Sequence, residues 1–367
     1  MALSNVTNST NLTVDSELAD ITNKIDLYVT PILYIVGFPG NIFSLVIWLQ
    51  KRMRHSSGCY LAALALDDLI FLVLHVILEL VKWKVPSLNF PFVCEAFTVI
   101  FLASQYLSPF LVLAFTTERY ISICHPFQRE KYCTNKRAKI VIICMVAAMP
   151  CLTALNGYFW TYDAVHGCMP RSTVLEGKTR SLYTVYSTTV DLLVFLVVPL
   201  SVLVLNVLVI REMRRLSRMD TVHLHGQSQK TGSTTVMLLA VSFYQIITTL
   251  PVSIAYAFYL QYDCKIQECL TEDEKHAENV YLLILAIIGE YGITHYAFNI
   301  FIYICTGKMF RQELAKLVVL PVRKLLARLP MDYTSLRSKS RGSEQSRNWV
   351  STNGNYDTEG TTEETLL

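Results

Sequence analysis

The chain has 367 residues, of which 52% are hydrophobic and only 17% charged, and its mean hydropathy is +0.37. A soluble protein of this length is far more polar. The net charge of +3 is too small to predict binding to nucleic acid. Length and composition therefore predict one helical bundle in a membrane and exclude a pair of soluble domains.

Residues 1–26 precede the first apolar stretch and are expected to form a polar N-terminal tail outside the cell. They lack the basic start and apolar core of a cleavable signal, so the first crossing itself is expected to direct insertion. Three Asn-x-Thr triplets begin at Asn5, Asn8 and Asn11 and are acceptors for glycosylation in the lumen. Triplets this short also occur by chance in a disordered Ser/Thr/Asn-rich tail, so both interpretations stay open.

Seven apolar stretches follow within residues 27–304, the predicted membrane domain. Each is long enough to cross ~30 Å of hydrocarbon as a helix. Helices are expected because unpaired backbone groups are costly in lipid, and no alternating barrel pattern is visible. The fold class is thus an all-α membrane protein with seven transmembrane helices. The stretches lie at about 27–50, 59–82, 93–123, 138–159, 183–210, 235–261 and 279–304.

Positive residues are concentrated in three of the segments that join the crossings. These segments are 51–54, 129–139 and 211–230, and the alternate segments hold far fewer lysines and arginines. Positive residues stay on the cytoplasmic side of a membrane protein. The charge pattern therefore predicts a multi-pass protein of the plasma membrane with its N terminus outside and its C terminus in the cytosol.

The cysteines divide by compartment in this topology. Cys94 opens crossing 3 at the outer face and Cys168 lies in the second outer loop, where oxidising conditions favour a disulfide. Cys264 and Cys269 lie together in the third outer loop and could close a second, smaller ring. No cysteine spacing resembles a zinc site.

An ordered set of short motifs runs from about Tyr28 to Leu317 and resembles the rhodopsin-like, or class A, G-protein-coupled receptors. Arg119 falls 25 residues after Cys94, the separation that this family shows between its bridge cysteine and its cytoplasmic arginine. The motifs are Gly40-Asn41, Leu64-Ala65-Leu66-Asp67-Asp68-Leu69, Glu118-Arg119-Tyr120, Pro199, Pro251 and Asn299-Ile300-Phe301-Ile302-Tyr303.

The resemblance implies a coupling site for a heterotrimeric G protein. Arg119 would pair with Glu118 at rest and contact the G protein on activation, and Pro126-Phe127 would press an apolar knob against the α subunit. The alternatives are an ordinary arginine that snorkels at a helix end, and a simple turn after a helix. The residues assigned to coupling are Glu118, Arg119, Tyr120, Pro126, Phe127 and Tyr303.

Four polar residues match family positions that surround an allosteric sodium ion, namely Asp68, Ser108, Asn299 and Asn41. A hard cation prefers such oxygen ligands. The alternative is a hydrogen-bonded polar cluster that ties the helices together without an ion. Beyond this possible sodium ion, no cofactor is expected. The family bridge also implies that Cys94 and Cys168 are joined.

Several departures from the family pattern narrow the subfamily. The Asn-Pro of crossing 7 reads Asn299-Ile300, and the aromatic switch before Pro251 is replaced by Thr248-Thr249-Leu250. Thr231 replaces the acid that locks the arginine in many members, and Val207 replaces a tyrosine. Because of these substitutions, we do not expect the usual activation switch of the family in this chain. They do not change the expected fold.

Two residues argue against an amine or retinal as ligand, and one motif favours a neuropeptide. Phe101 stands where aminergic receptors carry an aspartate, and Ile293 where opsins carry the retinal lysine. The spacing of Asn299, Ile302-Tyr303, Gly307 and Phe310-Arg311 is similar to invertebrate neuropeptide receptors of the FMRFamide and myosuppressin kind. A receptor for another small molecule or an odorant is the alternative.

Acidic residues in the outer half predict a basic, amidated peptide as ligand. Carboxylates bind arginine through paired, charge-assisted hydrogen bonds, and the three acids Glu79, Asp191 and Glu290 are expected to point into one cavity. Alternatively, Glu79 pairs with Lys82 at the helix end, and Asp191 bonds Thr188 and Thr189. The cavity would also be lined by Phe101, Gln105, Tyr106 and Tyr291.

The C-terminal part divides into two segments. Residues 305–329 alternate basic and apolar positions at helical spacing and predict an amphipathic eighth helix along the inner leaflet. Residues 330–367 predict a disordered tail, whose serines are candidate kinase sites that in this family recruit arrestin. The terminal Thr365-Leu366-Leu367 resembles a motif read by PDZ domains, or is simply the end of a polar tail.

Two other function classes have weaker support. A seven-helix transporter or ion pump typically shows internal repeats and broken half-helices, and none is visible here. An enzyme would need a nucleophile–base pair, a phosphate loop or a metal motif, and the sequence contains none of these. The sequence therefore favours a receptor.

Overall fold

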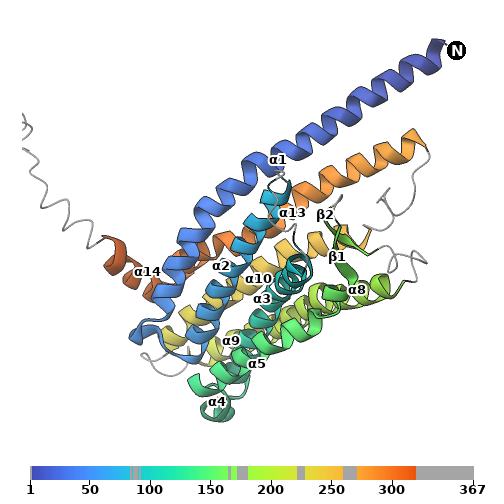
Figure 1. Cartoon of the computed structure of the whole chain (residues 1–367). Coiled ribbons are helices and arrows are strands. Elements are labelled where there is room, and N and C mark those ends of the chain that lie inside the picture. Colours follow the sequence, from blue (N-terminus) through green and yellow to red (C-terminus); the bar gives the residue numbers. More distant parts are fainter. Residues whose placement is uncertain are drawn as a thin grey trace, which may run out of the picture. The chain divides into compact units, whose positions relative to one another are not determined.

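The computed structural model describes the backbone of residues 2–82, 85, 90, 92–163, 167–171, 181–220, 228–258 and 271–319. Side chains are described within these ranges except at 2–13, 81–82, 167, 219–220, 228–234, 257, 272 and 318–319. The chain divides into two units, residues 1–314 and 315–367. The first unit holds the helical bundle (Figure 1). In the second, the described part is a π-helical turn, Ala315–Val319.

Within the described residues, seven helical segments are long and apolar enough to cross a membrane, which confirms the predicted seven-helix bundle. The elements of the bundle are α1 (Ala2–Trp48), η1 (Lys51–Met53), α2 (Ser56–Lys82), α3 (Val93–Cys124), α4 (Pro126–Tyr132), α5 (Asn135–Thr153), α6 (Asn156–Phe159), α8 (Leu182–Leu192), η3 (Leu193–Val197), α9 (Val198–Asp220), α10 (Ser228–Ala257), α13 (Glu272–Thr306) and α14 (Lys308–Leu314).

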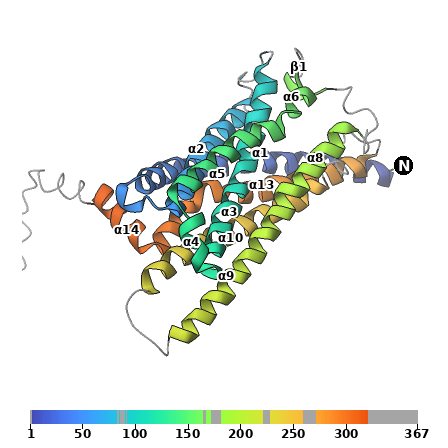
Figure 2. The same cartoon turned by 90° about the horizontal axis from the view of Figure 1, so that it is seen from below.

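A two-stranded antiparallel sheet joins the fourth and fifth crossings. Strand β1 (Trp160–Asp163) pairs with β2 (Gly167–Pro170), with Tyr162 opposite Cys168. In Figure 2, β1 and α6 lie at one end of the bundle and α4 lies at the other. We call these the disulfide end, for the bridge described below, and the Arg119 end, for the arginine near the end of α3.

Helix α1 begins at Ala2, although the first crossing was expected to begin at about residue 27. No glycine or proline precedes Pro31, so the N-terminal sequence holds no residue that readily ends a helix. Asp15 also contacts His276 of α13, with 2.6 Å between Oδ1 and Nδ1. The predicted boundary at residue 26 is therefore not marked by a break in the helix.

Helix α13 also begins before its predicted start, because a capping box defines its first turn. The Thr271 hydroxyl accepts a hydrogen bond from the Glu274 N–H at 3.3 Å, and the Glu274 carboxylate accepts one from the Thr271 N–H at 3.0 Å. Such reciprocal bonds satisfy N–H groups that the helix leaves open. Figure 1 shows α13 extending from the bundle at the same end as α1.

The fifth crossing is interrupted by a π-helical turn, η3, between α8 and α9. Pro199 follows this turn and has no N–H to donate to the carbonyl of Phe195, four residues earlier. The Ser253 hydroxyl of α10 donates to that carbonyl at 3.3 Å. Pro199 thus leaves the Phe195 carbonyl free to accept the hydrogen bond from Ser253 of α10.

Close approach of α1 to α2 and α13 depends on Gly37. A Cβ at this position would lie 2.7 Å from Leu72 Cδ1 and 3.2 Å from the backbone of Ala297. Only glycine leaves room for helices to pack at such a distance. Between α2 and α13, Phe71 and Tyr296 stack with ring centroids 3.7 Å apart. These contacts form the core beside the polar residues described next.

Candidate functional site

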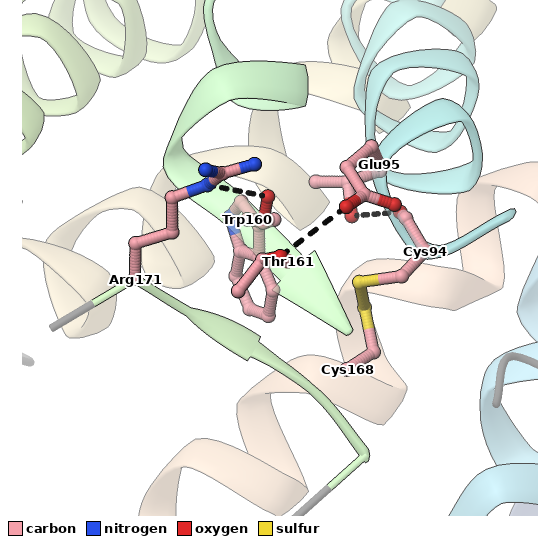
Figure 3. Close-up of a disulfide and its surroundings, with 7 residues drawn as sticks. Cys94, Glu95, Trp160, Thr161, Cys168 and Arg171 are labelled. Atoms are coloured by element: carbon pink, nitrogen blue, oxygen red, sulfur yellow. Dashed lines mark hydrogen bonds between the residues drawn. A yellow bond between two sulfur atoms is a disulfide. The ribbon is translucent and has the colours of Figure 1, made fainter. Parts of the chain in front are cut away.

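The predicted disulfide between Cys94 and Cys168 is present and attaches the β1–β2 hairpin to α3 (Figure 3). The two Cα atoms are 5.5 Å apart, within the range of native bridges. Beside the bridge, the Thr161 hydroxyl donates to Glu95 at 3.3 Å. The disulfide and this hydrogen bond together hold the hairpin over the disulfide end of the bundle.

Asp191 of α8 lies beside Tyr106 of α3. The Tyr106 hydroxyl donates to Asp191 Oδ1 at 2.7 Å, and the Tyr106 ring is buried edge-on against Phe195. The alternative bonds from Asp191 to neighbouring threonines are not seen for Thr189, whose hydroxyl donates to the Val185 carbonyl. Asp191 is therefore an acid held by an aromatic hydroxyl inside the helix bundle.

The other two predicted acids lie among α1, α2 and α13. Glu290 accepts a hydrogen bond from the Thr30 hydroxyl, and Glu79 is 1% exposed. The Tyr34 hydroxyl lies 2.7 Å from His75 Nδ1, one helical turn from Glu79. The alternative partner of Glu79, Lys82, lies outside the described side chains.

The described contacts therefore join Asp191 to Tyr106 of α3 and Glu290 to Thr30 of α1, and Glu79 is buried in α2. A single cavity shared by all three stays a prediction. Of the other predicted lining residues, Phe101 stacks near Phe71 and Phe97, and the Gln105 carbonyl faces the Tyr296 hydroxyl at 3.5 Å. Tyr291 is 40% exposed.

The predicted sodium residues belong to a buried polar core at mid-bundle. Asn299 donates to Asp68 Oδ2 at 2.9 Å, whereas Asp68 Oδ1 is buried without a hydrogen bond. Asn41 donates to the backbone carbonyls of Gly37 and Tyr296. The free carboxylate oxygen and the amide oxygen of Asn299 are donors that fit a hard cation.

Ser108 is also buried, but it bonds a residue that the sequence did not single out. Its hydroxyl oxygen accepts a hydrogen bond from Gln245 Nε2 of α10 at 3.0 Å. A second buried acid, Asp67, accepts from the Ser104 hydroxyl at 3.2 Å. Among the described residues, no three or more His, Cys, Asp or Glu side chains are grouped so that they could hold a metal ion.

At the Arg119 end, Glu118 is not paired with Arg119 as the resemblance implied. Its carboxylate oxygen Oε1 accepts hydrogen bonds from Ser56 at 2.6 Å and Ser57 at 3.1 Å. These serines open α2, and the N-terminus of a helix favours a carboxylate. Glu118 therefore joins α3 to α2, and the buried Nε of Arg119 makes no hydrogen bond.

His55 lies near Arg119 and is uncharged at neutral pH, so it adds no positive charge beside the Glu118 carboxylate. Burial, with a smaller effect of the nearby Arg119 guanidinium, lowers the pKa of His55. The ring nitrogen Nδ1 accepts a hydrogen bond from the Gly58 N–H at 3.0 Å, which only the unprotonated nitrogen can do. Arg119 is thus the principal cation beside the Glu118 carboxylate.

The remaining predicted coupling residues differ in exposure. Phe127, which follows Pro126 in α4, is 98% exposed. Tyr120 lies edge-on to His125. Tyr303 is fully buried between Trp48 of α1 and Phe310 of α14, with centroids 5.5 and 5.3 Å away.

Besides the ring contacts with Trp48 and Tyr303, helix α14 is attached by charged side chains to η1 and to the end of α13. Arg52 donates to the buried Glu313 carboxylate at 3.0 Å, and Arg311 donates to the carbonyls of Ile304 and Cys305 at the end of α13. The described helix spans seven residues. Its predicted place along the inner leaflet stays a prediction.

Residues 40–303 match the seven-transmembrane receptor family described as the rhodopsin family. The chain belongs to this family. The resemblance found in the motifs is thereby confirmed, and family membership places the chain among receptors and not among transporters.

Three relatives within this family illustrate its range. The FMRFamide receptor of Drosophila melanogaster is 27% identical over 300 residues, 73% of this chain and 53% of the relative. The thyrotropin-releasing hormone receptor of Gallus gallus is 37% identical over 29% of this chain and 28% of its own. The human neuromedin-U receptor 1 is 30% identical over 50% of this chain and 45% of its own. The chain thus spans about half of these relatives or less.

Departures from the rhodopsin-family pattern have visible structural settings. Ile300 packs against α1, where a Cβ at Gly40 would lie 3.0 Å from its Cγ2. Val207 is exposed on α9. It therefore does not supply the hydroxyl that a tyrosine at this position has in many members of the family. Thr248 donates to carbonyls of its own helix, whereas Thr249 is buried and its hydroxyl makes no hydrogen bond.

Sequence reasoning missed several residues of this receptor site. Ser56, Ser57 and Gln245 gave no signal, because isolated serines and glutamines are common at helix ends and interiors. Asp67 could have been found, since two adjacent acids in one membrane helix are rare and usually functional.

Other predictions concern parts of the chain that lie outside the described residues or side chains. These are the second ring of Cys264 and Cys269, the glycosylation acceptors Asn5, Asn8 and Asn11, the position of Thr231, and the tail with Thr365, Leu366 and Leu367.

Proposed function

We propose that the chain is a G-protein-coupled receptor of the plasma membrane that is activated by an extracellular peptide. The disulfide end would lie outside and the Arg119 end in the cytosol, as the oxidised bridge and the positive charges of 129–139 and 211–230 favour. Relatives named as receptors for FMRFamide, thyrotropin-releasing hormone and neuromedin-U support a peptide ligand.

The observation that carries the ligand class is the burial of acids near the disulfide end. Glu79 and Glu290 are buried and Asp191 is half-buried in helices of the membrane domain, where acidic side chains are costly and usually serve a function. A basic peptide would compensate their charge, and arginine can bond a carboxylate in a paired geometry. The neighbouring Tyr106 and Phe101 supply surface for an aromatic residue of the ligand.

A charge-swap series tests this assignment. A panel of amidated peptides is first screened on cells by calcium and cyclic AMP, and the most potent arginine-containing peptide is retained. Asp191→Arg and Glu290→Arg are each expected to lower its potency by about 30-fold or more, because truncating a buried charge pair costs ~2–5 kcal/mol. A peptide with glutamate in place of arginine should regain potency on the variant whose acid it faced.

Glu17→Arg is the matched control, since Glu17 is an exposed acid of α1 at the same end. Its potency should equal that of the unmodified receptor. Unchanged potency in both Asp191→Arg and Glu290→Arg, or an agonist that proves to be neutral and non-peptidic, would contradict the basic-peptide assignment and favour a small-molecule receptor.

We further propose that a sodium ion binds at Asp68, with Asn299 and Ser108 as additional oxygen donors. The buried Asp68 Oδ1, which makes no hydrogen bond, supports this assignment. Replacing NaCl by choline chloride should raise agonist affinity in the unmodified receptor by about fivefold or more, the size of a typical coupling between two sites. Asp68→Asn should abolish this dependence of agonist affinity on sodium. Asp67→Asn, which leaves Asp68 in place, should retain it. Equal sodium dependence in all three receptors would favour a polar cluster without an ion.

A further inference from the structure

Asp191 and Glu290 are bonded to different helices. Asp191 Oδ1 accepts from the Tyr106 hydroxyl of α3, whereas Glu290 accepts from the Thr30 hydroxyl of α1. Helix α8 carries Asp191, helix α13 carries Glu290, and α10 contacts both of these helices. Because the two carboxylates reach toward different neighbours, we expect a single guanidinium group to bond only one of them.

The surroundings of Asp191 are aromatic. The rings of Tyr106 and Phe195 meet edge-on with centroids 5.5 Å apart, and Tyr183 and Tyr186 lie within electrostatic reach of the Asp191 carboxylate. Asp191 is half-buried, and its Oδ2 makes no hydrogen bond to the described residues. One carboxylate among aromatic rings attracts a compact ammonium ion by charge and through the ring faces. This site therefore suits a primary ammonium group.

Glu290, in contrast, has a second acid in its neighbourhood. Tyr34 of α1 lies within electrostatic reach of both Glu79 and Glu290, and its hydroxyl lies 2.7 Å from His75 Nδ1. The two acids are buried, with exposed fractions of 1% for Glu79 and 7% for Glu290. A guanidinium group is a planar fork of several N–H donors, is less strongly hydrated than an ammonium ion and pairs with carboxylates inside proteins. This site therefore suits an arginine side chain.

We propose that the receptor recognises two separate cationic groups of its ligand, a primary ammonium group at Asp191 and a guanidinium group at Glu290. The ligand class is then an amidated peptide that has an arginine and also a free N-terminus or a lysine. This two-cation assignment rests on the proposed activation by a peptide, and it adds which cation each acid binds. A peptide that carries arginine alone would fill one site and leave Asp191 bonded only to Tyr106.

A double-mutant cycle between peptide and receptor tests the assignment. The arginine-containing peptide retained from the screen is made in two neutralised forms. One has its N-terminus acetylated and any lysine replaced by norleucine, and the other has neutral citrulline in place of arginine. On the unmodified receptor, each form should be about 30-fold or more less potent, as expected when one partner of a buried charge pair is lost.

The receptor variants are Asp191→Asn and Glu290→Gln, which remove the charge and keep the size of each side chain. Removing the ammonium should lower potency in Glu290→Gln and hardly change it in Asp191→Asn, because the partner carboxylate is already neutral there. Citrulline should give the opposite pattern. Glu17→Gln, at an exposed acid of α1, should show both losses in full. If the two variants respond alike to both forms, or the ammonium-free peptide is fully potent, the two-cation assignment is wrong and peptide activation stands.

Binding of small cations to the purified receptor tests the two sites without peptide activation. A compound that binds only the folded receptor raises its thermal stability. Phenylethylammonium should raise the melting temperature of the unmodified receptor and of Glu290→Gln, but not of Asp191→Asn. Propylguanidinium should raise it in Asp191→Asn, but not in Glu290→Gln. If these shifts occur and no peptide activates the receptor, the two sites stand and the proposed function fails. Equal shifts in both variants would overturn the two sites.

Discussion

Arg119→Ala is expected to reduce G-protein activation strongly while ligand binding at the cell surface persists. The buried Arg119 Nε makes no hydrogen bond, and Glu118 is already bonded to Ser56 and Ser57. We therefore expect the Arg119 guanidinium to serve a partner that binds at the Arg119 end, as the family resemblance implies. Losing one member of a buried charged contact costs ~2–5 kcal/mol, so G-protein affinity should fall by about 30-fold or more. The measurement is nucleotide exchange on purified G protein at matched receptor density.

The comparison variant is Arg129→Ala, which removes an arginine from α4 at the same end of the bundle. Because Arg129 lies on the exposed surface, its loss should change nucleotide exchange only slightly. Radioligand or fluorescent-peptide binding to intact cells establishes that both variants reach the surface. Full exchange activity in Arg119→Ala would remove Arg119 from the coupling site and leave the fold assignment unchanged.

Cys94→Ala is expected to cause the largest loss of folded receptor at the cell surface. The bridge to Cys168 attaches the β1–β2 hairpin to α3, and a side-chain hydrogen bond between Thr161 and Glu95 lies beside it. Removing a native disulfide costs ~2–5 kcal/mol in small secreted domains. Surface labelling and ligand binding should both fall strongly.

The double variant Cys94→Ala, Cys168→Ala should resemble either single variant, because each substitution removes the same bond. Cys144→Ala serves as the control, since Cys144 is a free and exposed cysteine of α5. A single variant with normal surface expression and normal ligand affinity would show that the hairpin is held by its other contacts.

The seven crossings, the bridge and the family could be read from the sequence because each depends on residues near one another in the chain or on a spaced motif. A spanning helix needs about 20 apolar residues and satisfies its backbone within itself. Helix α1 begins well before the first apolar stretch, and Asp15 in this polar extension contacts His276 of α13.

The sequence by itself determined which residues carry charge or hydroxyl groups inside the membrane, among them Glu79, Asp191, Glu290, Asp68 and Arg119. Only the tertiary structure decided their partners: Glu118 with Ser56 and Ser57, Ser108 with Gln245, and Asp191 with Tyr106. The physical reason is that a hydrogen bond between helices depends on the rotation and relative height of both helices, which packing at positions such as Gly37 sets. No local pattern in the chain encodes that geometry.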